Sequence, residues 1–362
     1  ICTYFFLIGT SIYFFFIVLI FSGLLFKRTY SPIHSKLPMI SVIIAARNEQ
    51  ENIKNILEDL VNQNMDKNDF EIIVVNDRST DETYSIINNY SSTYKNVKTI
   101  NIKNINMMTP KKYALTKAIE NSSGDIIIST DADCRVKKDW VNSMAQLVNN
   151  TDKIVIGYSK IKNSDSLLKQ YQNIDFLGIM SANAGLLNYN IICSGSGQNL
   201  AYKKKHFLDI DGFKPVQHLI SGDDMYLVQS ISKLKGAIFN YDPKSFVSTM
   251  PKNKIVEYLN QRTRWSSNSK NTIIDAPLFF LFLFSALITN CGILYGLYTQ
   301  SAVLILAILI KLSVEGLVIY IGCKIFETNT NLSSYIFWNL TQPIYIPLIT
   351  ISGLIGKYSW KK

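Results

Sequence analysis

The sequence predicts an α/β domain with a mostly parallel sheet, held between apolar segments long enough to cross a membrane. Three observations lead to this fold class. The chain opens with an uncharged run from Thr3 to Phe26, and a second apolar block runs from Pro277 almost to the end. Between them, short apolar strands alternate with amphipathic helices. That alternation is typical of a parallel sheet covered by helices on both faces.

Composition narrows the class of protein. Of the 362 residues, 48% are hydrophobic and 18% are charged, which excludes a wholly disordered chain. The mean hydropathy of +0.11 fits a protein that lies partly in lipid and partly in water. The net charge of +10 suits anionic lipid, nucleic acid or phosphorylated substrates without choosing among them. The five cysteines form no CxxC pair, so neither a disulfide framework nor a structural zinc site is predicted.

The first apolar run predicts a transmembrane helix over residues 1–27. A helix of about 20 apolar residues spans the hydrocarbon core, and the run is too long for the apolar region of a signal peptide. Lys27 and Arg28 follow it directly. The positive-inside rule therefore places the central domain on the cytoplasmic face of the inner membrane, with the N-terminus outside.

The C-terminal block, residues 277–356, predicts about three further spans, at 277–298, 301–323 and 335–355. The middle span carries Lys311 and Glu315, four residues apart on one helical face, where they can neutralise each other. The last span contains two prolines and is expected to be kinked or re-entrant. Four full spans would put the lysines after residue 356 outside, against the positive-inside rule, so either one segment does not cross or the rule fails here.

The central region predicts five strands and three helices in alternation. The strands are read from apolar runs at 40–45, 71–75, 97–102, 125–129 and 153–158. A helix over 49–63 has its apolar residues on one face, a second begins near Ser79 or Thr80 as a cap, and a third begins at Pro110. Ligands of such a sheet bind at the carboxyl ends of its strands.

Acidic residues follow two of these strands and one turn. Asp77 comes after the second strand, Asp131 and Asp133 come after the fourth as DAD, and Asp223 and Asp224 stand in SGDDMYL. In an extended segment residues i and i+2 point the same way, so the two carboxylates of DAD would share one side and favour a cation between them. Mg²⁺ and Mn²⁺ prefer such oxygen ligands, usually together with substrate phosphates. A helix cap or solvated turn is the alternative for any one of these acids.

Two further patterns bear on function. QRTRW at 261–265 lies shortly before the C-terminal block, and an interfacial anchor is its simplest interpretation, since Arg and Trp favour lipid headgroups. The mixed segment 255–265 predicts an amphipathic helix on the membrane surface. No P-loop is present, and Gly195 and Gly197 lack the third glycine of a dinucleotide fingerprint, which argues against both kinds of nucleotide site.

The ordered set SVIIAARNE, VVNDRSTD, DAD, GDD and QRTRW, lying between apolar spans, resembles the membrane-bound family 2 glycosyltransferases with the GT-A fold. The subset it is similar to contains cellulose, chitin and hyaluronan synthases and ceramide glucosyltransferase. The resemblance covers about residues 38–270 and implies a Rossmann-like GT-A domain there, between the N-terminal and C-terminal transmembrane regions.

The resemblance also implies roles for individual residues. Asp224 would be the general base, and Asp133 with Asp131 would hold a divalent cation, Mg²⁺ or Mn²⁺. The donor would be bound by Ala45, Arg47, Glu49, Asp77, Lys112 (or its neighbour Lys111), Asp131, Gln261, Arg264 and Trp265. The acceptor side would involve Cys193, Ser194, Gly195, Asp223 and Trp265. Asp223 replaces the usual Glu of the family, and the segment from Cys193 departs from the cellulose synthase form.

The activity that the resemblance implies is inverting transfer of a sugar from a nucleotide-sugar donor, expected to be a UDP-sugar. A lipid or lipid-linked glycan is the expected acceptor, because three C-terminal spans are few for a polymer pore. A processive polysaccharide synthase is the alternative, and a non-catalytic sugar-nucleotide sensor or scaffold is the alternative from another class. No nucleic-acid partner is expected, and a transporter fits less well because the spans are few.

Overall fold

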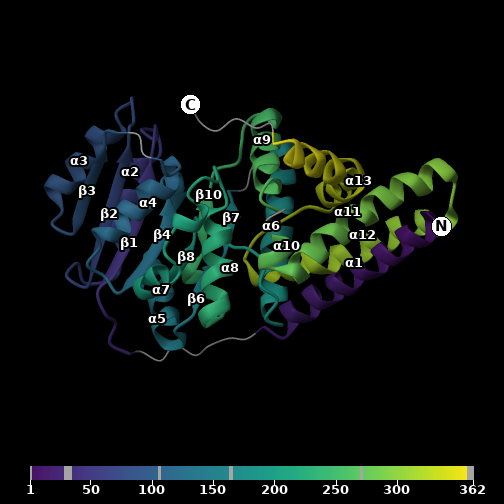
Figure 1. Ribbon diagram of the computed structural model, residues 1–362, viewed down its shortest axis with the longest axis horizontal. Helices are drawn as coiled ribbons and strands as arrows, with labels where there is room; N and C mark the ends of the chain where they lie inside the picture. The colour runs from purple at the N-terminus through teal and green to yellow at the C-terminus, as the bar shows by residue number, and fades with distance from the viewer. Residues whose placement is uncertain (1, 28–34, 105–106, 163–165, 270–271, 357–362) are drawn as a thin grey trace. The chain divides into compact units, whose positions relative to one another are not determined.

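The computed structural model divides the chain into two compact units, each described here by itself (Figure 1). The sheet unit comprises residues 29–160 and 194–250, and the helical unit comprises residues 1–28, 161–193 and 251–362. The structure describes residues 2–27, 35–104, 107–162, 166–269 and 272–356.

The sheet unit is built on a seven-stranded sheet with the order β3-β2-β1-β4-β8-β6-β9. Neighbouring strands are parallel except at β8, which runs antiparallel to both β4 and β6. The strands are β1 (Ile40–Ala46), β2 (Phe70–Asp77), β3 (Val97–Ile102), β4 (Ile126–Asp131), β6 (Ile154–Gly157), β8 (Leu200–Lys203) and β9 (Ala237–Asn240). The mostly parallel sheet and the five predicted strands are thus confirmed, and β8 and β9 are additions.

Helices cover this sheet, and a small second sheet is formed by strands that lie between those of the large sheet in the sequence. The helices are α2 (Ile53–Val61), α3 (Thr83–Thr93), α4 (Pro110–Glu120), α5 (Trp140–Thr151), α7 (Lys204–Asp209) and α8 (Asp223–Lys235). A three-stranded sheet has the order β5-β10-β7, with β5 (Cys134–Arg135), β7 (Ser159–Ile161) and β10 (Val247–Thr249). The start of α4 at Pro110 is as predicted.

The predicted cap of α3 at Ser79 or Thr80 was wrong. The residue that precedes α3 is Glu82, whose side chain makes no capping bond. Ser79 Oγ instead accepts from the Asn48 backbone at 3.1 Å, and the Thr80 backbone donates to Asn48 Oδ1 at 2.9 Å. These side chains therefore join the loops that follow β1 and β2, which is a contact between distant segments that local sequence does not reveal.

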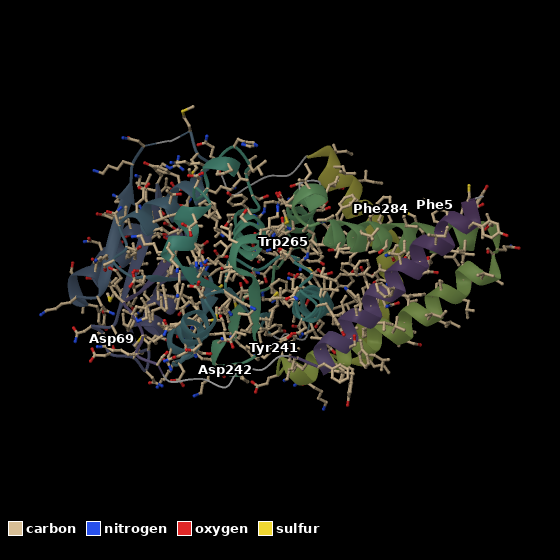
Figure 2. The ribbon with its side chains drawn as sticks, turned by 60° about the horizontal axis from the view of Figure 1, so that its bottom comes forward. Phe5, Asp69, Tyr241, Asp242, Trp265 and Phe284 are labelled. Carbon is tan, nitrogen blue, oxygen red and sulfur yellow. The ribbon has the colours of Figure 1, made fainter. Side chains whose placement is uncertain are left out.

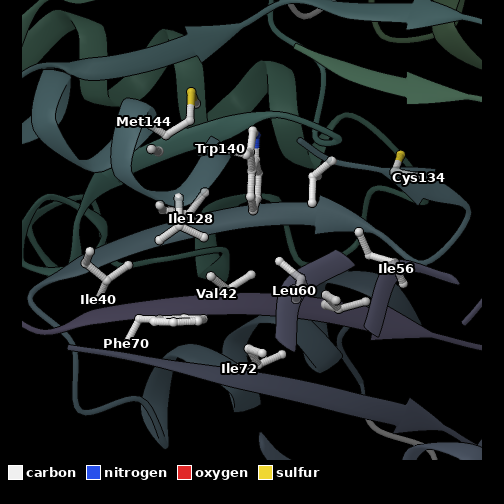
Figure 3. Close-up of a cluster of buried hydrophobic side chains, with 14 of the residues drawn as sticks. Ile40, Val42, Ile56, Leu60, Phe70, Ile72, Ile128, Cys134, Trp140 and Met144 are labelled. Carbon is white, nitrogen blue, oxygen red and sulfur yellow. The ribbon is translucent and has the colours of Figure 1, made fainter. Parts of the chain in front are cut away.

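The core of the sheet unit forms because the central strands carry apolar residues on both faces of the sheet. Ile40, Val42, Phe70 and Ile128 are almost fully buried, as expected for strands covered on both faces. Trp140, at the start of α5, belongs to the same cluster of buried side chains, which Figure 3 shows in close-up. Its indole N–H donates to Asn199 Oδ1 at 2.9 Å, so the polar atom of this buried ring is satisfied.

The helical unit contains three helices long and apolar enough to cross a membrane, among the residues that the structure describes. They are α1 (Cys2–Leu25), α11 (Pro277–Thr299) and α12 (Ala302–Ile325). The unit also contains α6 (Leu167–Leu187), α9 (Ile255–Ser266), α10 (Thr272–Asp275) and α13 (Leu332–Ile355). The helix α13 matches the predicted last span in position but is not one of the three. Its buried Asn339 and Gln342 make it more polar.

Two predictions concern the apolar helices: the pairing of Lys311 with Glu315, and the side of the membrane on which the central domain lies. Lys311 and Glu315 form the predicted buried pair, with 3.0 Å between Nζ and Oε2. Glu315 also accepts from Asn339 Nδ2 of α13 at 2.8 Å and from Tyr13 Oη of α1, so the pair ties three helices together. The side of the membrane was predicted from Lys27 and Arg28, and the lysines after residue 356 conflicted with that prediction; of these residues only Lys27 is among those that the structure describes.

Candidate active site

The carboxyl ends of the parallel strands bring two of the predicted acids to one edge of the sheet. Asp131 is the last residue of β4 and Asp77 is the last residue of β2, with β1 between the two strands. In the parallel register Ala45 lies beside Asp131, and Ala46 lies beside Asn76. The sheet geometry thus places these residues where a ligand of an open α/β sheet binds.

A pocket lies at this edge, and its charged residues are three acids and one lysine. It is lined by Ile43, Lys111, Leu115, Ser129, Thr130, Asp131, Gly197, Leu200, Tyr202, Asp223, Asp224 and Leu227. All of these residues belong to the sheet unit. The acids come from β4 and α8, and the lysine comes from the first turn of α4. The pocket is therefore assembled from distant segments of the sequence, which lie between residues 43 and 227.

The two acids of GDD enter the pocket because a helix begins there. Gly222 precedes α8 with φ of +82°, a left-handed conformation that glycine adopts without steric cost. Asp223 and Asp224 then occupy the first turn of α8. Carboxylates are favoured at a helix N-terminus by the helix dipole and by free backbone N–H groups, and Asp224 Oδ1 accepts from the Met225 backbone at 2.8 Å.

Lys111 is the centre of the charged cluster. Its Nζ lies 3.0 Å from Asp131 Oδ1 and 3.4 Å from Asp223 Oδ2. Burial by itself lowers the pKa of Lys111, but the carboxylates of Asp131, Asp223 and Asp224 outweigh it and raise that pKa well above its usual range. The ammonium is therefore charged at neutral pH. It is also the only cation among the residues that line the pocket.

Asp224 is held in place by the main chain. Its Oδ2 accepts from the Gly197 backbone at 3.1 Å. A Cβ atom at position 197 would lie 3.5 Å from Asp224 Cβ and 3.6 Å from Lys111 Nζ, so a larger side chain there would fill the space between the charged groups. Burial and the neighbouring Asp223 raise the pKa of Asp224, against the lowering effect of Lys111. A raised carboxyl pKa in a pocket is typical of a proton-transfer group.

Lys112, which was predicted to bind the donor, does not line the pocket. Its side chain is buried, and Nζ donates to the backbone carbonyls of Leu219 and Ser221. Thr109 Oγ1 donates to the same Leu219 carbonyl at 3.0 Å. Consecutive helical residues point about 100° apart, so one lysine of the pair meets the pocket and the other meets the loop that leads into α8. Of the two lysines, Lys111 is therefore the one that contacts the acids of the pocket.

Replacing Lys112 with Met is expected to lower the free energy of unfolding by about 1–3 kcal/mol, because buried carbonyls lose their donor. Thermal unfolding of the purified chain measures the effect. Lys117→Met is the matched control on the same helix, because Lys117 makes only surface contacts, a pair with Glu120 and a position over the Tyr113 ring. An exposed pair of this kind is worth at most about 1 kcal/mol. Equal losses of stability in the two variants would contradict the role given to Lys112.

The DAD segment is not extended as predicted. Asp131 ends β4, whereas Asp133 lies in the turn between β4 and β5, and its Oδ1 accepts a weak hydrogen bond from the Cys134 thiol at 3.8 Å. Among the described residues no three His, Cys, Asp or Glu side chains gather as a complete metal site. Mg²⁺ and Mn²⁺ commonly use one or two carboxylates with substrate phosphates. The excess of carboxylates over ammonium groups in the pocket fits that kind of cation.

Of the predicted residues near the ends of β1 and β2, Arg47 and Glu49 follow β1 and Asp77 ends β2, and the two loops that follow these strands are bonded to each other. The Glu49 backbone donates to Thr83 Oγ1 at 2.7 Å. Asp77 is buried and accepts two bonds from the guanidinium of Arg78, at 2.7 and 3.2 Å. Arg47 is half-buried, and its Nε makes no hydrogen bond within the described part of the chain. None of these three residues is among those that line the pocket.

The remaining predicted residues divide between the two units. Ser194 and Gly195 belong to the sheet unit, whereas Cys193, Gln261, Arg264 and Trp265 belong to the helical unit. Burial raises the pKa of the Cys193 thiol, which therefore stays protonated and unreactive. Gln261, Arg264 and Trp265 lie on α9, and Trp265 is labelled in Figure 2. Residues that the sequence did not single out include Ser129, Thr130 and Tyr202 of the pocket.

Known proteins resemble this chain in sequence and in fold. Residues 41–215 match the model of glycosyl transferase family 2. The probable glycosyltransferase YdaM of Bacillus subtilis (strain 168) is 28% identical over 249 residues, which are 66% of this chain and 57% of that protein. Glycosyltransferase AglE of Haloferax volcanii is 28% identical over 196 residues, 53% of this chain and 60% of that protein. The chain thus spans about three fifths of the length of these relatives.

The fold has a solved counterpart over its whole length. The mannosyltransferase PcManGT from Pyrobaculum calidifontis, solved in complex with GDP-Man and Mn²⁺, aligns with a TM-score of 0.67 and 18% identity. The alignment covers 99% of this chain and 100% of that one. This likeness confirms the Rossmann-like GT-A fold with apolar helices at both ends. Residues 41–215 of this chain therefore form a domain of glycosyl transferase family 2.

Proposed function

We propose that the chain is an inverting glycosyltransferase that moves a sugar from a nucleotide-sugar donor to a lipid or lipid-linked glycan at the membrane. The observation that carries this proposal is the pocket at the sheet edge, in which Asp131, Asp223 and Asp224 surround Lys111. The three apolar helices of the same chain support a membrane acceptor, since a soluble donor alone would not require them. UDP-sugars are the proposed donors.

The proposed reaction is a single displacement at the anomeric carbon. Asp224 accepts the proton of the acceptor hydroxyl while the hydroxyl oxygen bonds to the anomeric carbon. The bond between that carbon and the diphosphate oxygen breaks, and its electron pair leaves on the nucleoside diphosphate. One displacement inverts the anomeric centre. As this bond breaks, the sugar becomes oxocarbenium-like and the leaving oxygen becomes negative. The cationic Lys111 is proposed to offset the negative charge on the leaving oxygen.

A divalent cation, Mg²⁺ or Mn²⁺, would be held by Asp131 and Asp133 together with the donor phosphates. When bound, it supplies positive charge that offsets the charge of the diphosphate. The neighbour PcManGT was solved with GDP-Man and Mn²⁺, which supports the choice of cation. Arg47, Glu49 and Asp77 are proposed to bind the donor. Gln261 and Arg264 of α9 are proposed to bind it as well, and Trp265 is proposed to contact the donor and the acceptor.

Release of nucleoside diphosphate by the full chain in lipid nanodiscs tests this function. A panel of UDP-sugars and GDP-mannose is incubated with and without extracted membrane lipids, and the products are identified by mass spectrometry. We expect release from at least one donor to rise with the lipids, together with a lipid that has gained one sugar. A long polymer would instead indicate a processive synthase. Absence of release from every donor would contradict a catalytic role.

A further inference from the structure

We propose that Arg262, held by Asp175, is a positioning residue that sets the side chains of Gln261 and Trp265 for sugar transfer. This inference rests on the proposed function, in which those two residues act on the bound substrates. The sequence singled out Gln261, Arg264 and Trp265 and treated Arg262 as an interfacial residue. All the contacts that follow lie within the helical unit.

Arg262 and Asp175 form a buried ion pair between two helices. Nε of Arg262, on α9, lies 2.7 Å from Oδ2 of Asp175, on α6. The exposed fractions are 4% for Arg262 and 7% for Asp175, which contradicts a position of Arg262 on the membrane surface. Burying two charges is costly unless their remaining hydrogen-bonding groups are satisfied. A buried pair of this kind is therefore stable only in a geometry that satisfies the hydrogen-bonding groups of both side chains.

Further donors hold Asp175 in this geometry. Tyr258 Oη donates to Oδ2 at 2.9 Å, and Trp338 Nε1 lies 3.5 Å from Oδ1. Tyr258 comes from α9 and Trp338 comes from α13. The carboxylate therefore joins three helices and is a fixed point against which Arg262 is oriented. Because charge-assisted bonds are shorter and stronger than neutral ones, the guanidinium has little freedom to rotate.

The guanidinium also contacts the two proposed functional residues, besides lying 4.8 Å from the centre of the Tyr258 ring. Nη1 donates to Gln261 Oε1 at 3.1 Å, and Cζ lies 4.1 Å from the centre of the Trp265 ring. Neighbouring residues of a helix do not face each other, so this bond turns the Gln261 side chain toward Arg262. Trp265 is one turn further along α9 and receives the flat face of the cation.

Lysine could not make this set of contacts. The guanidinium presents Nε to Asp175, Nη1 to Gln261 and a planar face to Trp265, while Nη2 is buried without a hydrogen-bond partner within the described residues. The ammonium group of lysine is a compact charge, without the several fixed donors and the planar surface of a guanidinium. The fixed planar geometry, rather than the positive charge alone, is what links the three side chains.

A merely structural role for the pair is the alternative, and the chain contains a matched control for it. Lys311 and Glu315 also form a buried pair in the helical unit, at 3.0 Å. Lys311 lies over the ring of Trp338, and within the described part of the chain it does not contact Gln261 or Trp265. Lys311→Met therefore removes a buried cation from the same unit, one that even neighbours Asp175's partner Trp338, while it removes no direct contact of Arg262.

The first experiment does not depend on activity. The full chain is labelled with 5-fluorotryptophan in detergent, and the ¹⁹F resonance of Trp265 is assigned as the one that Trp265→Phe removes. We expect this resonance to shift or broaden in Arg262→Met and to stay in place in Lys311→Met. An unchanged Trp265 resonance in Arg262→Met would overturn the inference, whether or not the proposed function holds.

The second experiment measures transfer by the active enzyme. Arg262→Met is expected to lower kcat by about 10- to 100-fold, since small displacements of positioned groups cost that much, with the donor KM changed by less than about threefold. Arg262→Lys should lose nearly as much. In a Gln261→Ala, Trp265→Leu background the same Met substitution should cost less than about twofold, because coupled residues are not additive.

The two kinds of failure are distinguishable. An inactive wild-type chain would contradict the proposed function and leave the ¹⁹F result to decide the contacts of Arg262. An active wild type in which Arg262→Met costs the same factor in both backgrounds would contradict the positioning role. Recovery of wild-type kcat by Arg262→Lys would contradict the role of the planar fork.

Discussion

Replacing Asp224 with Asn is expected to lower kcat by about 10²- to 10⁴-fold, the range that a general base contributes. Asp224 lies in the first turn of α8, and its carboxylate is fixed by the backbone N–H groups of Gly197 and Met225. Asn is nearly the same shape and keeps one accepting oxygen, but it cannot take up the acceptor proton. Transfer from a labelled nucleotide sugar by the purified chain measures the loss.

The same variant should remain folded. The pKa of Asp224 is raised by burial and by Asp223, so the ionised form is disfavoured in the folded state. A carboxyl group with a raised folded pKa costs stability at pH values above that pKa, and the cost disappears as pH falls below the unfolded value. Removing the charge at neutral pH therefore removes this cost, and the unfolding temperature should be unchanged or higher.

The pH dependence of the wild-type rate follows from the same shift. Asp224 acts as a base only when it is deprotonated, so kcat should fall as the pH is lowered through its raised pKa. That limb should lie above the value near 4 of an ordinary Asp. Asp209→Asn, an exposed acid at the end of α7, is the control and should keep the wild-type rate and profile. Near wild-type turnover by Asp224→Asn would remove the assignment.

Removing divalent cations is expected to reduce transfer by at least about 100-fold, because a bound metal contributes several kcal/mol to the stabilisation of developing charge. Without the cation, the donor diphosphate would meet three carboxylates and a single ammonium in the pocket. Treatment with EDTA followed by titration with Mn²⁺ or Mg²⁺ measures both the loss and the recovery. Undiminished transfer after thorough chelation would exclude the proposed cation.

Replacing Asp133 tests whether this residue is a ligand of the cation. Asp133→Asn should raise the Mn²⁺ concentration that gives half-maximal activity by about 10-fold or more, since a neutral amide is a weaker ligand of a hard cation than a carboxylate. Asp139→Asn is the matched control, because Asp139 lies six residues later and only contacts Asn64 and Lys244 at the surface. An unchanged requirement for Mn²⁺ in Asp133→Asn would contradict the assignment.

The position of the acids at the strand ends was predictable from the sequence, because parallel strands all point toward the same edge of the sheet. Apolar runs followed by Asp77 and Asp131 identify β2 and β4, and parallel strands place their carboxyl ends at one edge. The bounds of β3 (Val97–Ile102) and the start of α4 at Pro110 were also predicted correctly. Both elements are specified by residues that are close in sequence.

The interior of the pocket was not predictable in this way. The strand β8 inserts antiparallel beside β4, and the loop before it presents the Gly197 backbone to Asp224. Lys111 and Lys112 are adjacent and chemically identical, so no local pattern tells which one faces the acids. The choice depends on the loop at 219–221, which receives Lys112.

The sequence by itself determined the α/β class, the apolar helices and the acids at the strand ends, because hydrophobic periodicity and strand polarity are local properties. Only the tertiary structure decided that Lys111 joins Asp131 to Asp223, and that Arg262 pairs with Asp175, which lies 87 residues away. The physical reason is that burying a charge is favourable only beside a partner, and which partner is near depends on how distant segments pack.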